Sequence, residues 1–386
     1  MTSEQSRKQL QDIRRQIDRV DDDILVLFRE RMDLVRDVAA CKQAAGLPIR
    51  SGGRETEILG RISDAAGPEL ARYARFFYST LFDVAKSWQR ASIPAASPLR
   101  EAIDAARAET PELFPETATV ACQGIAGAYS QEAAEKIFSF PRISYFNSFD
   151  KVFTAVEKGL CRYGILPIEN SSYGSVSRIY DLMREHKFYI CRSTRLRVSH
   201  KLLAKPGTPL SAIREVVSHE QALGQCSSFL QSLDNVRLTS CSNTAEAARL
   251  VADSDRADIA AISSADCAEL YGLEILKDAI EISDNNYTRF ICISRDMEIY
   301  PGSGRLSIML SLPHRPMSLY HTIAKFSTLG VNLTKLESRP IPGSDFEFMF
   351  YFDMDASLAS PDIENLICDF DRQPEPFVLL GNYTEV

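Results

Sequence analysis

Three cationic side chains interrupt an apolar stripe of helical spacing near the N-terminus. Arg31 stands where the spacing requires an apolar residue, Arg14 lies on the same face one turn from its apolar neighbours, and Lys42 lies three turns beyond Arg31. The apolar positions are Leu10, Ile13, Ile17, Val20, Ile24, Leu27, Leu34 and Val38. Long cationic side chains can extend from the edge of such a stripe into solvent. Alternatively, they bind a small dianion between helices, because a guanidinium offers a carboxylate two parallel donors.

The turn LPIRSGGRETE (47–57) supports the dianion site. Arg54 and Glu55 open a new helix just after a Gly pair and can point back at the first helix. Gln89 lies near the end of the next helical run and adds a neutral donor beside Trp88. A lone Trp near a helix end is more often a core residue than a ligand.

Polar loops follow one predicted strand after another in the middle of the chain. GIAGAYS (124–130) follows TVACQ, a second polar loop follows YGILPIE, and a third follows VRLTSCS. In open α/β sheets, ligands bind beyond the carboxyl ends of the strands, although each loop alone is explained by helix capping. Their succession favours a small anionic ligand in a cleft. The candidate binding residues are Ala128, Tyr129, Ser130, Glu169, Asn170, Ser171, Gly174, Ser175, Asn243 and Thr244.

Thr288 and Arg289 enter a predicted strand from the polar loop SDNNYTRF (283–290), with Phe290 after them. A Thr at this place is usually a good β-former, and an Arg is usually a surface residue.

The sequence offers no support for several other kinds of chemistry. G-x-x-G at 124–127 is not a dinucleotide motif, and there is no phosphate-binding G-x-x-x-x-G-K-[ST] sequence. His200 and His219 have no metal-ligand spacing to Cys or Asp, so neither a metal nor a cofactor is expected. The acidic balance, 52 Asp+Glu against 44 Lys+Arg, argues against nucleic acid as a partner.

Composition and length indicate a multidomain globular protein. The chain has 386 residues, of which 45% are hydrophobic and 25% charged. Nine scattered Cys without a C-x-x-C pair, no signal peptide and no apolar run long enough for a membrane span predict a reduced, cytoplasmic protein.

The elements that must position these residues fall into three segments. Residues 1–92 are helical in pattern, and 93–117 form a Pro-rich linker with one short helix. From 118, short strands alternate with helices, which predicts parallel sheets covered on both faces. Residues 305–386 read as a βαββαβ unit. A continuous first helix would be ~60 Å long and could not be covered by its own domain, so we expect a homodimer or a higher homo-oligomer.

The first 92 residues resemble the all-helical chorismate mutases, through Arg14, Arg31, Lys42, Arg54–Glu55 and Gln89 in this order and spacing. The resemblance implies an intertwined homodimer in which Arg14 reaches into the partner's site. It also implies that Arg14 and Arg31 bind the carboxylates of chorismate, that Lys42 and Gln89 face the ether oxygen, and that Glu55 takes the ring hydroxyl. Ser51 and Ala85 depart from the family pattern, which has Asp and Ser there, so weaker mutase activity is expected.

Residues 118–297 resemble the prephenate dehydratases, through GIAGAYS, PIENS and YTRF. The resemblance implies two α/β lobes of periplasmic-binding-protein type that close on prephenate. It assigns to Thr288 the loss of the ring hydroxyl and to Arg289 a pairing with a substrate carboxylate. Glu220 stands where the family usually has Pro, so a local change in that loop is expected.

The C-terminal βαββαβ pattern resembles the ACT domain, which binds phenylalanine between paired domains in prephenate dehydratases. Glu337, Ser338, Arg339 and Pro340 match its E-S-R-P motif, for which a strand end before a Pro turn is the simpler explanation. Met317, Ser318 and Leu319 align with a second ligand motif that normally has Gly in place of Met317.

The three resemblances occur in the order of bifunctional chorismate mutase/prephenate dehydratases. They imply conversion of chorismate through prephenate to phenylpyruvate, with L-phenylalanine as effector. The alternative is a non-catalytic amino-acid sensor with a helical dimerisation arm. Such a sensor would need neither Thr288 nor the cations in the helical stripe.

Overall fold

The computed structural model describes residues 3–45, 52–91, 97–282, 285–341 and 347–386. The chain divides into two compact units. The first comprises residues 1–97, 312–333 and 359–375, and the second comprises 98–311, 334–358 and 376–386. Within the described ranges, no helix is both long and apolar enough to cross a membrane.

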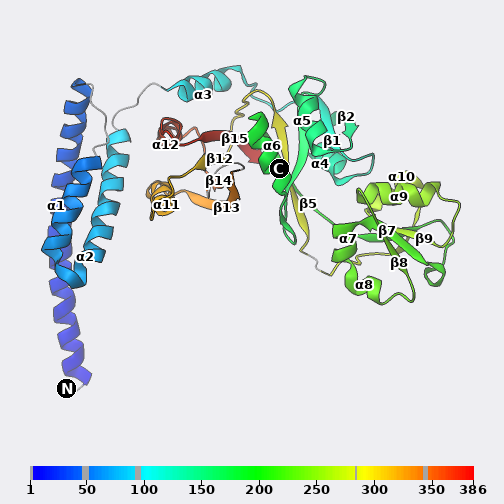
Figure 1. Cartoon of the computed structure of the whole chain (residues 1–386), viewed down its shortest axis with the longest axis horizontal. Coiled ribbons are helices and arrows are strands. Elements are labelled where there is room, and N and C mark those ends of the chain that lie inside the picture. The colour runs from blue at the N-terminus through cyan, green and yellow to red at the C-terminus, as the bar shows by residue number, and fades with distance from the viewer. Residues whose placement is uncertain (1–2, 46–51, 92–96, 283–284, 342–346) are drawn as a thin grey trace. The chain divides into compact units, whose positions relative to one another are not determined.

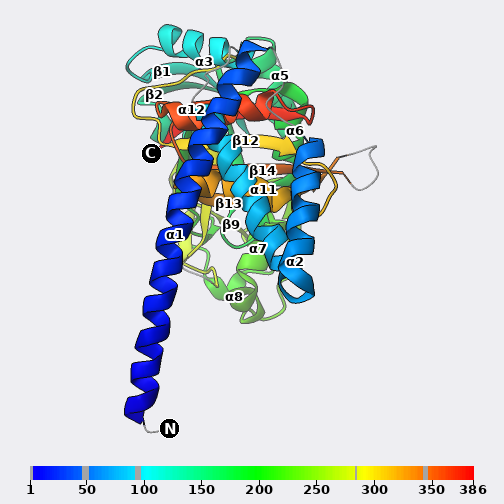
Figure 2. The ribbon, with the colours of Figure 1, turned by 90° about the vertical axis from the view of Figure 1, so that its left-hand side faces the viewer.

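Two long helices dominate the first unit (Figure 1). Helix α1 runs uninterrupted over Ser3–Ala44, as expected for a segment without Gly or Pro. Helix α2, Gly52–Ala91, bends at Gly67, where φ is 71° and Pro68 follows. Figures 1 and 2 both show the N-terminal part of α1 extending beyond α2. The unit also contains α11 (Ser318–Thr328) and α12 (Pro361–Asp371).

The apolar stripe of α1 is left largely uncovered within the chain. Ile17, Val20 and Leu27 are 52%, 55% and 63% exposed. This exposure fits the expectation that a second copy covers the stripe, because monomers rarely leave so large an apolar surface in water.

The second unit contains a large mixed sheet. Its strand order is β13-β14-β12-β15-β5-β11-β3-β1-β2, and β4 pairs with β3. The first strands are β1 (Thr117–Gln123), β2 (Phe140–Phe146), β3 (Tyr163–Asn170), β4 (Gly174–Ser175) and β5 (Tyr189–Arg197). The others are β11 (Tyr287–Ser294), β12 (Arg305–Ser311), β13 (Asn332–Pro340), β14 (Phe348–Asp355) and β15 (Phe377–Glu385). Its helices are α3 (Pro98–Glu109), α4 (Tyr129–Ile137), α5 (Phe149–Glu157) and α6 (Ser177–His186).

A smaller sheet of order β10-β6-β9-β7-β8 forms a second lobe of this unit. Its strands are β6 (Lys201–Ala204), β7 (Glu215–His219), β8 (Arg237–Cys241), β9 (Ile259–Ser263) and β10 (Glu274–Lys277). The associated helices are the 3₁₀ turn Leu210–Ala212, α7 (Glu220–Gln225), α8 (Ser227–Gln231), α9 (Thr244–Asp253) and α10 (Ala265–Tyr271).

The expectation of parallel sheets holds only in part, because both sheets are mixed. Strand β1 runs parallel to β2 and β3, and β7 runs parallel to β8 and β9. Strand β11 runs antiparallel to β3 and β5, and β6 runs antiparallel to β9 and β10. The reason is that the chain leaves the first lobe after β5 and returns after β10, so β11 enters the first sheet from the other end. This return places Thr288 at the edge where the lobes are connected.

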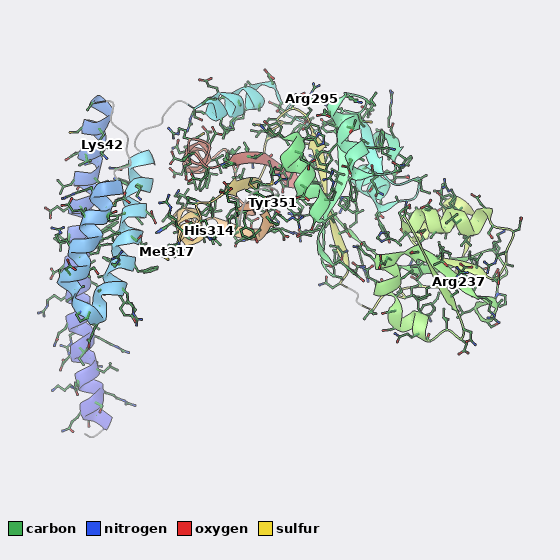
Figure 3. All side chains as sticks on the ribbon, in the orientation of Figure 1. Lys42, Arg237, Arg295, His314, Met317 and Tyr351 are labelled. Carbon is green, nitrogen blue, oxygen red and sulfur yellow. The ribbon has the colours of Figure 1, made fainter. Side chains whose placement is uncertain are left out.

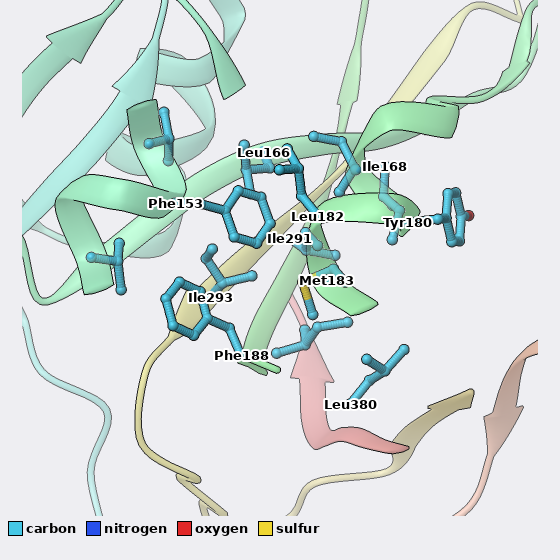
Figure 4. Close-up of a cluster of buried hydrophobic side chains, with 14 of the residues drawn as sticks. Phe153, Leu166, Ile168, Tyr180, Leu182, Met183, Phe188, Ile291, Ile293 and Leu380 are labelled. Atoms are coloured by element: carbon cyan, nitrogen blue, oxygen red, sulfur yellow. The ribbon is translucent and has the colours of Figure 1, made fainter. Parts of the chain in front are cut away.

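The C-terminal strands share the sheet and the core of the first lobe. Thr384 and Glu385 of β15 pair in parallel with Arg192 and Ser193 of β5. Figure 4 shows Leu380 of β15 with residues of β3, α5, α6 and β11 in one hydrophobic cluster. The cluster also contains Met309, Tyr351 and Tyr383. Burial of these large side chains, each worth ~1.5–3 kcal/mol, ties the C-terminal strands to the lobe that carries Thr288.

Candidate active sites

Arg31 of α1 faces α2. Its guanidinium lies 5.5 Å from the ring centre of Phe82. Its Nη1 is buried and has no hydrogen-bond partner within the described part of the chain. Burial lowers the pKa of Arg31 and Tyr78 acts in the opposite direction, but an Arg remains charged at neutral pH. An unpaired cation between two helices is suited to binding a carboxylate.

Phe82, Lys86 and Gln89 recur at helical spacing on one face of α2. Gln89 is 7% exposed and its Nε2 donates to the carbonyl of Val35, one turn after Arg31, at 3.0 Å. Lys86 Nζ donates to Glu55 Oε2 at 3.1 Å. Through these three residues, this face of α2 contacts Arg31, the backbone of Val35 and Glu55. Sequence reasoning missed Lys86, because one more Lys on a helix carries no signal.

Arg14 and Arg54 are not among the described contacts of this face. Arg14 precedes Arg31 by 17 residues, or ~25 Å along α1, and is exposed. Lys42 lies near the C-terminal end of α1, as labelled in Figure 3. Arg54 pairs with Glu57 at 2.7 Å on the surface. Ser51 falls outside the described residues. Arg14 can meet the site of Arg31 only if it is supplied by another copy of the chain.

Thr288 and Asn170 lie directly opposite each other on the antiparallel strands β11 and β3. Asn170 Nδ2 donates to Thr288 Oγ1 at 3.0 Å and to Asn286 Oδ1 at 2.9 Å. The pairing shifts register just beyond them, between Arg289 and Phe290. Such irregularities re-aim side chains and are frequent beside active sites. The structure thus brings Thr288 and Asn170 into contact.

The GIAGAYS loop meets the second lobe. A Cβ on Gly127 would lie 2.8 Å from Cys267 Sγ, and its φ of 87° also favours glycine. Tyr271 Oη donates to the carbonyl of Ala126 at 2.8 Å. Asn243, predicted as a ligand contact, caps α9 by accepting from Glu246 N, so the capping explanation holds for its Oδ1. Thr244 opens α9.

The start of α4 is also largely enclosed. Ala128 and Ser130 are buried, and Ala128 precedes the helix without a side-chain cap. Tyr129 Oη donates to the carbonyl of Ser199 at 3.1 Å. Burial raises the pKa of Tyr129 above its ordinary range, so this phenol acts as a neutral donor at physiological pH.

Glu169 and Arg289 pair with each other and with C-terminal strands. Arg289 Nε lies 2.8 Å from Glu169 Oε1, and its Nη2 pairs with the buried Asp353 of β14. Lys335 of β13 pairs with Glu169 and donates to Ser175 Oγ at 2.8 Å. The side chain of Arg289 is only 5% exposed, so it does not present a free guanidinium to substrate.

The remaining residues predicted to bind substrate lie either near the end of β3 or in the hydrophobic core. Ser171 Oγ donates to the carbonyl of Asn285 at 2.8 Å and accepts from Tyr287 N at 2.9 Å. Gly174 is exposed at the start of the short strand β4. Phe290 is 3% exposed in a hydrophobic cluster, so packing explains this residue without a substrate contact.

The effector residues predicted on β13 face the dehydratase lobe. Ser175 Oγ donates to Glu337 Oε2 at 2.8 Å. Arg339 donates to Ser177 Oγ at 2.7 Å and to Asp181 Oδ2 at 3.3 Å. Ser338 and Pro340 alternate with them and are exposed, as the period of a strand requires.

Met317, labelled in Figure 3, precedes α11 in the left-handed conformation, with φ 72° and ψ −2°. It is 39% exposed, and Ser318 and Leu319 after it are half-buried. Glycine adopts this left-handed conformation without strain, whereas a residue with a Cβ does not.

No group of His, Cys, Asp and Glu in the described ranges is arranged to hold a metal ion. Sequence reasoning missed Gln225 and Asn286, which belong to the Thr288 network. Asn286 lies two residues before Thr288, and this closeness in sequence is the one feature that could have indicated Asn286 as a site residue.

Two protein-family models match the chain. The model for prephenate dehydratase matches residues 120–298, and the model for chorismate mutase type II matches residues 13–90. Among curated relatives, an arogenate dehydratase/prephenate dehydratase of Arabidopsis thaliana, named chloroplastic, is 38% identical over 276 residues. That match covers 68% of this chain and 72% of the relative. A bifunctional chorismate mutase/prephenate dehydratase of Neisseria gonorrhoeae is 33% identical, over 69% of this chain and 74% of the relative.

Two solved structures resemble the chain over 69% of its length. Prephenate dehydratase of Arthrobacter aurescens in complex with L-Phe has 26% identity and a TM-score of 0.63, with 89% of it covered. A protein described as a novel type of quorum quenching acylase, GqqA, has 30% identity and a TM-score of 0.63, with 98% covered. On these matches, the chain belongs to the prephenate dehydratase family and carries a type II chorismate mutase domain ahead of its dehydratase domain.

Proposed function

We propose that this chain is a bifunctional enzyme of phenylalanine biosynthesis, which rearranges chorismate to prephenate and converts prephenate to phenylpyruvate. The observation that supports the second activity most directly is the hydrogen bond from Asn170 to Thr288 where the two lobes are connected. We place both reactions in the cytoplasm, a setting consistent with nine free Cys thiols.

The first reaction needs a pocket that holds a compact conformer of a dianion. It is a pericyclic rearrangement that needs no nucleophile and no proton transfer, so positioning and charge stabilisation suffice. Arg31, whose Nη1 has no partner among the described residues, takes one carboxylate. Arg14 from a second copy takes the other, and the exposed apolar stripe of α1 forms the dimer contact. Lys42 and Gln89 face the ether oxygen, and Glu55 takes the ring hydroxyl.

The second reaction removes carbon dioxide and water from prephenate. The ring carboxylate departs as carbon dioxide, and its electron pair expels the ring hydroxyl. That hydroxyl accepts a proton and leaves as water. Thr288 supplies the donor that a poor leaving group requires. Aromatisation of the ring supplies the driving force.

Regulation by L-phenylalanine is also part of the proposal. The solved relative from Arthrobacter aurescens is named as a complex with L-Phe. The C-terminal βαββαβ strands share a sheet and a core with the Thr288 lobe, which gives an effector there a physical route to the reaction. We assign this segment as an ACT domain.

The test is to incubate purified protein with chorismate and follow prephenate and phenylpyruvate separately. We expect prephenate to form and then to be consumed as phenylpyruvate appears. Protein that binds phenylalanine but converts neither substrate would identify the sensor instead. Because the Arabidopsis relative is named for both substrates, arogenate is offered in parallel, and its conversion to phenylalanine would broaden the assignment.

A further inference from the structure

Two backbone N–H groups determine the orientation of the Asn170 side-chain amide. The N–H groups of Ser172 and Tyr173 donate to Asn170 Oδ1 at 2.9 and 3.0 Å. Since a backbone N–H can only donate, the oxygen of Asn170 must face the turn. Its Nδ2 must therefore face Asn286 and Thr288, which lie 2.9 and 3.0 Å away.

The orientation of Asn170 in turn fixes the donors and acceptors from Asn286 to His200. Asn286 must present Oδ1 to Asn170, and this oxygen also accepts from Gln225 Nε2 at 3.4 Å. Gln225 is then oriented with Oε1 toward His200 Nε2, at 2.6 Å. A carbonyl oxygen only accepts, so His200 Nε2 must carry a proton.

His200 is 2% exposed, on the segment that connects β5 with β6. Burial lowers the pKa of its imidazole, while Gln225 and the carboxylate of Glu281 act in the opposite direction. Glu281 Oε2 accepts from the backbone N of His200 at 3.0 Å. A neutral imidazole has one N–H, and the bond to Gln225 places it on Nε2.

Two donors in this chain of hydrogen bonds have no acceptor among the residues that the structure describes. Both protons of the Asn170 amide are engaged, and Thr288 Oγ1 accepts one of them, so the hydroxyl proton of Thr288 is free to donate. Asn286 Nδ2, in a residue 2% exposed, has no acceptor among the residues that the structure describes. An unpaired buried donor costs about 1–3 kcal/mol, and a bound oxygen would remove this cost.

We propose that His200 is a positioning residue of the dehydratase and that Asn286 Nδ2 is a second donor, beside Thr288, for a carboxylate or hydroxyl oxygen of the substrate. The inference rests on the proposed function. It adds two residues to the site and fixes the direction of every hydrogen bond between His200 and Thr288.

Two substitutions of His200 differ in which ring nitrogen their side-chain amide nitrogen can replace. The amide nitrogen of Gln reaches the place of Nε2, whereas that of Asn reaches the place of Nδ1. We expect His200→Gln to keep the kcat of phenylpyruvate formation within about threefold of wild type. His200→Asn should lower kcat about tenfold at nearly unchanged KM, the effect of one lost hydrogen bond. Equal rates in the two variants would overturn the role of His200.

Asn286→Asp tests the second donor, because it keeps Oδ1 and replaces Nδ2 by an anionic oxygen. We expect KM for prephenate to rise at least about tenfold, since the aspartate repels the substrate. An unchanged KM would overturn the contact. Chorismate consumption by each variant is the folding control, and His186→Asn is the matched control for replacing a His elsewhere in this lobe.

A measurement without activity separates this inference from the proposed function. ¹⁵N NMR of histidine-labelled protein, with His200 assigned through His200→Gln, reports its tautomer. A neutral imidazole with its proton on Nε2 at pH 7 supports the proposed chain of hydrogen bonds from His200 to Thr288. A proton on Nδ1 alone, or an imidazolium, overturns it. If the wild type forms no phenylpyruvate, the proposed function fails. The tautomer of His200 still tests the direction of the hydrogen bonds between His200 and Thr288.

Discussion

Arg289, the residue after Thr288, forms a buried ion pair with Asp353 of β14. The Asp353 side chain is 1% exposed, and Ser307 also donates to it. Two carboxylates, Asp353 and Glu169, therefore share the guanidinium that, by the family resemblance, would pair with a substrate carboxylate. This pair joins the strand that carries Thr288 to the C-terminal strands.

Arg289→Met should destabilise the protein by about 3–5 kcal/mol, because it leaves Asp353 buried without a counter-charge. Asp353→Asn is the partner variant. The double substitution should cost at least about 1 kcal/mol less than the sum of the two, as expected for groups in contact. Urea unfolding of the four proteins measures the cycle. Unchanged stability with a raised KM for prephenate would show that Arg289 binds substrate after all.

The pair between Lys335 and Glu169 should depend on pH in a defined direction. Burial alone would raise the pKa of Glu169, but Arg289 and Lys335 hold it below its usual value. A lowered pKa contributes stability above pH ~4.5 that is lost as the pH falls through the folded-state value. Lys335→Met should therefore cost about 1–2 kcal/mol at pH 7 and progressively less below pH ~4.5. A cost that is constant from pH 7 to pH 3 would contradict the assignment.

Met317→Gly should stabilise the protein by about 1 kcal/mol, because φ of 72° strains any residue with a Cβ. We also expect wild-type inhibition by phenylalanine to be weak and to strengthen in this variant. Met317→Ala is the control, since it removes the side chain but keeps the strain. Thermal unfolding and titration of dehydratase activity measure the two effects. A wild type more sensitive to phenylalanine than Met317→Gly would show that Met317 is no obstruction.

Mutase activity should be recovered by mixing two inactive proteins. Arg14→Ala and Arg31→Ala should each be nearly inactive with chorismate. Because Arg14 lies ~25 Å along α1 from Arg31, one intact site can form only across two chains. Arg15→Ala, which removes a neighbouring surface cation paired with Asp12, should leave activity unchanged. Absence of recovery, with subunit exchange demonstrated, would rule out the crossed arrangement.

Local patterns predicted much of the architecture. The absence of Gly and Pro predicted α1, and the βαββαβ order predicted the C-terminal elements. The local patterns did not predict the strands β4, β5, β6 and β10. The antiparallel entry of β11 was missed because it depends on where the chain returns to the first lobe, which no local pattern encodes.

The sequence predicted those residues of the candidate site that belong to short sequence motifs. Thr288 and Asn170 belong to such motifs and lie together. The partner of Arg289 could not be inferred, because Asp353 lies 64 residues away and is brought close only by the packing of β14. The roles of Gln225 and His200 could not be inferred for the same reason. Residues that are linked by side-chain hydrogen bonds across the fold follow no regular spacing in the sequence.

Thr288→Val gives the most direct test of the account. The variant keeps the shape of the side chain and removes its hydroxyl, and Thr288→Ser is the control that retains the hydroxyl. With chorismate supplied, we expect Thr288→Val to lower phenylpyruvate formation by about 100-fold or more while chorismate is consumed at the wild-type rate and prephenate accumulates. Equal loss of both activities in a folded Thr288→Val protein, or undiminished phenylpyruvate formation, would contradict the assignment of Thr288.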